Sequence, residues 1–158
     1  MKKGFTMIEL IFVIVILGVL ASVAIPRLAA TRDDAEVAKA ATNLTTAVSD
    51  ITAYYTAKGT ISGMSQKFNE ITNALSKDGK LYVKGKTECV SVALPTANAT
   101  SDKVNITLRF KNGATDDAVC QQIAKLPGIL AMCGQSDKSK LSGSTCSIQI
   151  GGSGGIQF

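Results

Sequence analysis

The chain has 158 residues, of which 46% are apolar and 5% aromatic, with 17 Lys and Arg against 12 Asp and Glu and no histidine. This length is that of one domain, with or without an appendage. Without histidine, Ser-His-Asp and Cys-His nucleophiles, zinc fingers and H-E-x-x-H metalloprotease sites are excluded, and the few aromatic residues, none of them Trp, supply little for stacking bases or sugars.

The apolar residues are concentrated near the N-terminus. Residues 5–25 contain 17 apolar residues out of 21, and Leu10–Ile25 carries no charge. A helix over residues 5–25 would be about 31 Å long, enough to cross the hydrocarbon core of a bilayer. A cleaved secretory signal peptide, with small residues near Ser22, is one interpretation. Glu9 argues against it, because a carboxylate in an apolar run is costly to insert and a disposable signal does not need one.

The start of the chain fits a second interpretation. The basic leader MKKG is followed by FTMIEL and by an apolar run that ends in AIP. Over about the first thirty residues the chain resembles the type IV pilins and the pseudopilins of type II secretion and DNA-uptake systems. The resemblance implies that a prepilin peptidase cuts after Gly4, that the new amine of Phe5 is methylated, and that the hydrophobic segment is retained.

Glu9 and Thr6 are the polar residues of this segment nearest to the cleavage site. After cleavage, the Phe5 amine and the Glu9 carboxylate would lie one helical turn apart at membrane depth, where each charge alone is costly. The resemblance implies that Glu9 neutralises the N-terminal amine of a neighbouring subunit during filament assembly. The simpler alternative is that Glu9 only complements the helix dipole. Thr6 either satisfies a free helix N–H or is a small polar filler.

Gly18 and Pro26 are the expected flexible points of the same helix. A proline in a helix interior removes one hydrogen bond and crowds the preceding turn, so a kink or local melting near Ser22 to Pro26 is predicted. The resemblance implies that this region can unwind when the subunit enters a fibre. The alternative is that Pro26 ends a transmembrane helix, with Arg27 anchoring it at the interface.

A long amphipathic segment follows Pro26. Apolar residues recur at spacings of three and four, which predicts a helix with one buried stripe: Val37, Ala41, Leu44, Val48, Ile51 and Tyr55. Gly59 after Lys58 is a suitable C-cap. A single helix from Phe5 to Lys58 would be roughly 80 Å long. An anchor followed by an independent coiled coil is disfavoured because the repeat is under three heptads long.

The remaining chain predicts short elements of both types. The first is a helix that ends at Asp78-Gly79 and contains Met64, Phe68, Ile71 and Leu75. Four strands are expected at Leu81–Val83, Cys89–Leu94, Val104–Phe110 and Ser147–Ile150. A second helix, capped by Asp116 and ended by Pro127-Gly128, contains Val119, Ile123 and Leu126.

These elements predict an α+β, pilin-like fold. One long N-terminal helix, half of it transmembrane, packs on a small antiparallel sheet of three or four strands. The expected division is a leader at 1–4, the transmembrane half of the helix at 5–25, its amphipathic half at 26–59, an α+β globular domain at 60–150 and a flexible Gly-rich tail at 151–158.

Four cysteines follow the membrane segment. No two of these cysteines form a C-x-x-C pair, which disfavours a zinc site and favours two disulfides in an oxidising compartment. The four are Cys89, Cys120, Cys133 and Cys146. Spacing leaves all three connectivities open; the family resemblance implies Cys133 with Cys146 and Cys89 with Cys120. No metal and no cofactor is predicted.

Lysines are dense only at Lys77, Lys80, Lys84 and Lys86, with Asp78 among them. A solvated loop is the commoner explanation of such a cluster, although DNA uptake would also use positive charge. Removal of the leader leaves 15 basic and 12 acidic residues, a net +3, which requires no nucleic acid and leaves that partner open.

Three functions compete. A membrane-anchored periplasmic enzyme lacks a convergent catalytic set, and a secreted disulfide-bonded binding domain would need the conventional signal. We therefore expect a non-enzymatic structural subunit of a type IV-like filament. Before assembly, one span would anchor it in the bacterial inner membrane with its globular domain in the periplasm. After assembly, it would lie in a filament in the periplasm or at the cell surface. The resemblance implies as partners copies of the chain, minor pilins or pseudopilins, prepilin peptidase, a platform protein and an assembly ATPase.

The kind of filament is a narrower question. Major type II secretion pseudopilins usually have a Tyr-Pro turn and an acidic calcium-binding loop; here no Tyr-Pro follows Tyr55, and Asp137 stands nearly alone in a Gly/Ser-rich region, so no calcium site is predicted. We expect a pseudopilin of a secretion or DNA-uptake system, with an adhesive or motility pilin as the alternative.

Overall fold

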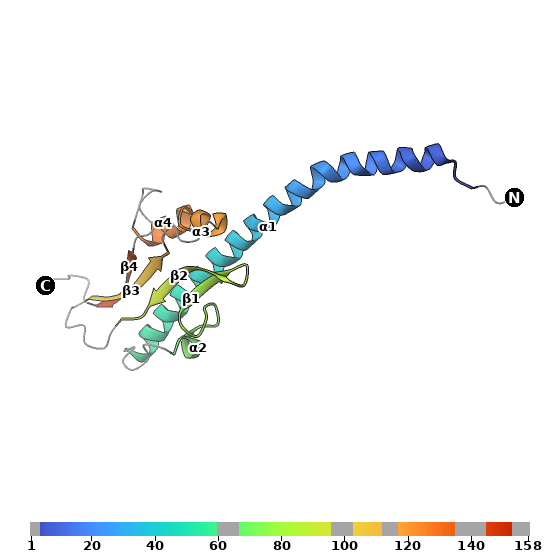
Figure 1. Cartoon of the computed structure of the whole chain (residues 1–158). Helices are drawn as coiled ribbons and strands as arrows, with labels where there is room; N and C mark the ends of the chain where they lie inside the picture. Colours follow the sequence, from blue (N-terminus) through green and yellow to red (C-terminus); the bar gives the residue numbers. More distant parts are fainter. Residues whose placement is uncertain (1–3, 60–66, 96–102, 112–116, 135–144, 153–158) are drawn as a thin grey trace. The chain divides into compact units, whose positions relative to one another are not determined.

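The structure, a computed structural model, describes residues 4–59, 67–95, 103–111, 117–134 and 145–152. Its elements in chain order are α1 (Met7–Lys58), α2 (Phe68–Ile71), β1 (Lys80–Val83), β2 (Thr87–Ala93), β3 (Lys103–Phe110), α3 (Ala118–Ile123), α4 (Pro127–Met132) and β4 (Thr145–Gly152) (Figure 1). The fold is α+β, with one long apolar N-terminal helix and a four-stranded antiparallel sheet, as expected. The chain forms two compact units, residues 1–35 and 36–158.

The first unit contains the apolar part of α1. Among the described residues, α1 is the one helix long and apolar enough to cross a membrane. Its large apolar side chains are exposed around the whole helix, so they have no partner within the described chain. Residues 22–26 remain helical in spite of Pro26, so the local melting predicted there as one of two outcomes does not occur in the structure.

The second half of α1 contributes one buried stripe to the folded unit. Val37, Leu44, Val48 and Ile51 are buried, as the spacing predicted. Two expected positions differ: Ala41 and Tyr55 are only partly buried, whereas Ala40 and Ala47 are buried, because the stripe of a 3.6-residue helix is wider than one row. The helix ends as predicted: Gly59 has a φ of +70°, and its N–H donates to the Tyr55 carbonyl at 2.8 Å.

The sheet packs on this stripe with one face. Its strands follow the order β1-β2-β3-β4, each antiparallel to its neighbour. Val90, Ile106 and Leu108 are fully buried in the same core as the α1 stripe. Strand β4 extends to Gly152, two residues into the segment expected to be a flexible tail, because Gly151 pairs with Val104. Residues from Ser153 onward lie outside the described chain.

The helix expected to reach Asp78 is much shorter. Helix α2 contains only four residues and stops before Thr72, whose backbone is extended (φ −147°, ψ 146°). The Thr72 hydroxyl donates to Asp50 Oδ2 at 2.7 Å and accepts from the Ala74 N–H at 3.1 Å. These bonds hold the backbone out of the helix, as hydroxyl side chains do at turns. Met64, expected in this helix, lies outside the described residues.

The prediction for the second short helix was wrong at its end. Pro127 does not merely stop α3; it occupies the first turn of α4, where its missing N–H costs nothing. At the start of α3 the N-cap is Asp117, whose Oδ1 accepts from the Val119 N–H at 2.9 Å. Asp116, the predicted cap, lies outside the described residues.

Gly79 gives a prediction about stability. It has a φ of +71°, and a Cβ built there would overlap the Phe68 ring. Gly79→Ala should therefore lose about 1–2 kcal/mol for the left-handed backbone and about 1–3 kcal/mol more for the overlap. Gly85→Ala is the matched control, because Gly85 has a φ of +74° and open space around it. Chemical denaturation should show the larger loss at Gly79; equal losses would mean that the Phe68 contact contributes nothing.

Candidate functional site

The N-terminal end of α1 is closed by a reciprocal set of hydrogen bonds between Thr6 and Glu9. The Thr6 N–H donates to Glu9 Oε2 at 2.8 Å, and the Thr6 hydroxyl donates to the same oxygen at 2.7 Å. The Glu9 N–H approaches Thr6 Oγ1 at 3.4 Å. This is a capping box, in which a Ser or Thr and an acid three residues later satisfy helix N–H groups that have no partner in the helix. Thr6 is therefore a cap and not a filler.

The residues around this cap are accessible. Gly4, Phe5 and Thr6 precede the helix and are exposed, with 90% of Phe5 accessible. A Cβ added at Gly4 or at Gly18 would meet no atom within 4 Å. The bond between Gly4 and Phe5 thus lies in non-helical, uncovered chain, where the backbone can enter the active site of a peptidase.

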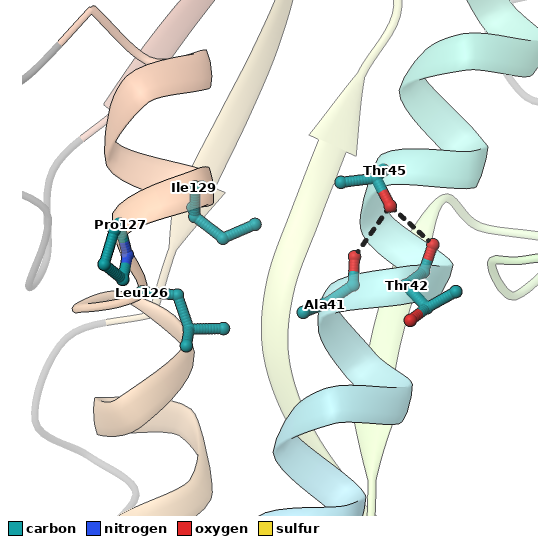
Figure 2. Close-up of a pocket in the computed structure, with 7 residues that line it drawn as sticks. Ala41, Thr42, Thr45, Leu126, Pro127 and Ile129 are labelled. Atoms are coloured by element: carbon teal, nitrogen blue, oxygen red, sulfur yellow. Dashed lines mark hydrogen bonds between the residues drawn. The ribbon is translucent and has the colours of Figure 1, made fainter.

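An apolar groove lies between α1 and α4 in the folded unit (Figure 2). Its lining residues are Ala41, Thr42, Thr45, Leu126, Pro127, Gly128 and Ile129. The Thr45 hydroxyl donates to the carbonyls of Ala41 and Thr42 at 3.1 and 2.9 Å, so it is engaged with its own helix. The groove encloses about 250 Å³, less than typical small-molecule sites of about 300–1,000 Å³.

A second hollow is polar and lies beside α2. It is lined in part by Asp50, Glu70 and Thr72. Asp50 is already bound to the Thr72 hydroxyl, and Glu70 forms an ion pair with Lys67 at 3.0 Å. The described residues contain no group of three His, Cys, Asp or Glu side chains able to hold a metal ion. Asp137, weighed above for calcium, lies outside these residues.

Part of the lysine cluster is built into the sheet. Glu88 Oε2 lies 3.1 Å from Lys80 Nζ and 3.6 Å from Lys111 Nζ. The hydrogen bond that Lys80 donates to Glu88, together with the negative charge of Glu88, raises the pKa of Lys80. Lys111 follows β3 and is far from Lys80 in sequence, so only the strand register brings it to the cluster. The cluster expected from the sequence did not include Lys111, although the alternation of β3 already predicted which residues of that strand share a face.

The comparisons with known proteins locate the recognisable part of the chain. Residues 1–25 match the family model described as the prokaryotic N-terminal methylation motif. The chain carries a prepilin-type signal. No curated protein and no solved structure gives a significant match.

The prepilin-type signal covers the residues whose geometry is described above. It includes Gly4 and Phe5 of the predicted cleavage site, the Thr6–Glu9 capping box and Gly18. Pro26 lies one residue beyond the match and inside α1. This signal supports a type IV pilin-like protein that a prepilin peptidase processes, and the apolar helix that follows fits anchoring in the inner membrane.

The domain behind the prepilin-type signal contains two disulfides. Cys89 on β2 pairs with Cys120 on α3, and Cys133 after α4 pairs with Cys146 on β4. These are the two pairs that the family resemblance implied. Each bond joins the segment that contains α3 and α4 to a strand of the sheet. Such bonds persist in oxidising compartments.

Proposed function

We propose that the chain is a structural subunit of a type IV-like filament, of the pseudopilin kind, in a secretion or DNA-uptake system. The observation that carries this proposal is the prepilin-type signal on a helix whose apolar side chains are exposed on all sides. Such a surface needs lipid before assembly and other copies of the helix afterwards. The folded unit behind it is small, disulfide-bonded and α+β.

In this proposal the leader is residues 1–4, and the mature chain begins at methylated Phe5. Residues 5–25 anchor the subunit in the inner membrane, residues 26–59 continue the helix, and residues 60–150 form the periplasmic domain. Gly18 and Pro26 are the positions at which the helix adapts to the fibre, because Pro26 removes one helix hydrogen bond. Copies of the chain, minor subunits, a prepilin peptidase, a platform protein and an assembly ATPase are the proposed partners.

Glu9 has two roles in the proposal. Within its own chain it caps α1 through Oε2. Cleavage leaves the Thr6 N–H and hydroxyl in place, so this cap persists in the mature subunit. The Glu9 charge is then available to the amine of Phe5 on a neighbouring copy, which offsets the cost of holding both charges at membrane depth.

Two substitutions separate these roles. Glu9→Gln keeps a side chain that serves in a capping box but removes the charge, whereas Glu9→Ala removes both. We expect both variants to be processed at Gly4 and to enter filaments at least about tenfold less than the parent chain, since an unpaired buried charge costs several kcal/mol. Quantification of sheared filaments against the membrane fraction measures this.

Thr6→Ala is the control, since it weakens the cap and leaves the charge. If Glu9→Gln assembles normally while Thr6→Ala does not, the cap alone matters and the charge pairing between subunits is wrong. Normal assembly of Glu9→Ala would remove both roles.

An adhesive or motility pilin is the alternative within the same class. Genes beside this one discriminate the two: a secretin with exoproteins or DNA-uptake components supports the pseudopilin, and a retraction ATPase supports the pilus.

A further inference from the structure

The outer face of the sheet gathers cationic residues from three separate parts of the chain. Lys80 on β1 pairs with Ser91 on β2, and Ser91 pairs with Arg109 on β3. Residues directly opposite each other in antiparallel strands point to the same face. Lys80 and Arg109 therefore share a row about 10 Å long, two strand spacings apart. Lys111 joins them through its ion pair with Glu88.

The tip of the β1–β2 hairpin adds two more lysines. Lys84 has a φ of +50° and is followed by Gly85 at +74°, and the Lys86 N–H donates to the Val83 carbonyl at 3.2 Å. Positive φ at both central residues is a type I′ turn, in which Asn, Asp or Gly is preferred at the first position. Lysine occupies this position at a conformational cost, and such outliers cluster at functional sites.

One aromatic ring lies among these charges. Tyr82 is 42% exposed, and it is the only exposed large apolar or aromatic side chain in the described residues outside residues 5–28. It stands opposite Glu88 in the register, on the face away from the core residues Leu81 and Val83. We call this surface the hairpin face; it consists of Tyr82 with Lys80, Lys84, Lys86, Arg109 and Lys111.

The hairpin face keeps an excess of positive charge after the ion pairs of the described residues are counted. Glu88 lies between Lys80 and Lys111, and Asp117 lies 3.5 Å from Lys84 Nζ. The charge of Asp78 also acts on Lys80. Five cations less these three carboxylates leave +2. Among the described residues, Arg109 and Lys86 have no ion-pair partner.

We propose that the hairpin face binds single-stranded nucleic acid, with Tyr82 stacking on a base and the cations contacting phosphates. Cationic side chains beside an exposed ring on a sheet match the way proteins bind single strands without reading sequence. A duplex offers phosphates but no free base face to the ring. This inference goes beyond the filament role: binding is measured on the isolated subunit, so its failure and a failure to assemble are separate results.

The experiment uses the full chain in detergent micelles and a fluorescein-labelled oligodeoxythymidylate of about 15 nucleotides, the upper range of single-strand site sizes. Anisotropy is recorded over a series of salt concentrations. For single strands the slope of log K against log salt changes by about 0.7 for each phosphate that a cation no longer neutralises. Lys86→Gln and Arg109→Gln should therefore each reduce the slope by about 0.7.

Tyr82→Ala should weaken binding by roughly tenfold or more while leaving the slope unchanged, because stacking does not release counterions. Lys58→Gln and Lys125→Gln are matched controls, since each removes one exposed lysine from another part of the folded unit. A duplex of the same length should bind more weakly than the single strand.

Three results would overturn the proposal. Equal slope changes in the two control variants would mean diffuse electrostatic attraction. Equal affinity for duplex and single strand, with no effect of Tyr82→Ala, would remove the stacking. Heparin that binds more tightly than the oligonucleotide, and equally to the Tyr82→Ala variant, would assign the face to acidic polysaccharides.

Discussion

Replacing Gly4 by leucine is expected to leave nearly all of the protein as an uncleaved precursor in the membrane. Gly4 lies in exposed, non-helical chain before α1, and a Cβ added there would meet no atom within 4 Å. A peptidase that closes on the bond between Gly4 and Phe5 needs close approach to this backbone, which a branched side chain obstructs. Intact-mass measurement of membrane extracts separates the precursor from a mature chain that lacks four residues and carries a methyl group.

Gly18→Ala is the matched control for this experiment. Gly18 lies in the apolar segment that follows the leader, and an added Cβ meets no atom there, so maturation of this variant should be normal. Complete maturation of Gly4→Leu would mean that a different peptidase, or a different bond, is involved. A mature N-terminus near Ile25 in the parent chain would instead indicate the conventional secretory signal.

Removing the disulfide between β2 and α3 is expected to destabilise the folded unit more than removing the other disulfide. Cys89 and Cys120 are both buried and are 31 residues apart, whereas Cys133 and Cys146 are 13 apart. Loop-closure entropy predicts roughly 3–4 kcal/mol for the longer loop and about 3 kcal/mol for the shorter one. The Cys89→Ala/Cys120→Ala double variant should therefore have the lower urea midpoint.

Tyrosine fluorescence of the full chain in detergent measures these midpoints, because the chain has three tyrosines and no tryptophan. The Cys133→Ala/Cys146→Ala variant is the matched comparison, because it removes the other disulfide by the same pair of substitutions. An unchanged midpoint after loss of Cys89 and Cys120 would contradict the loop-entropy argument for this pair. Addition of a reductant to the parent chain should reproduce the combined effect.

The elements that the sequence located correctly are those in which apolar residues recur with a strong period or a clear end signal is present. The strand around Ile106 and Leu108 alternates cleanly, and one face of it is buried, so its bounds are predicted within a residue. The end of α1 is marked by Gly59 in a left-handed conformation. In both cases the local sequence and the packing favour the same conformation.

The failures occur where an interaction distant in sequence decides a local structure. Helix α2 ends at Thr72 because its hydroxyl binds Asp50, which lies 22 residues earlier in α1. The hairpin face depends on Arg109 and Lys111, which reach Lys80 and Glu88 only through strand pairing. At Pro127 the sequence allowed two structures, because a proline can end one helix or occupy the first turn of the next, and the wrong one was predicted.

The two disulfides also determine the covalent connectivity of the chain after damage. A single peptide bond cut between Cys133 and Cys146 leaves the two fragments linked through sulfur, and a single cut between Cys89 and Cys120 does the same. A subunit nicked by an external protease in either interval therefore keeps its mass on a gel until it is reduced. In the proposed filament, such a nick need not release any part of the subunit.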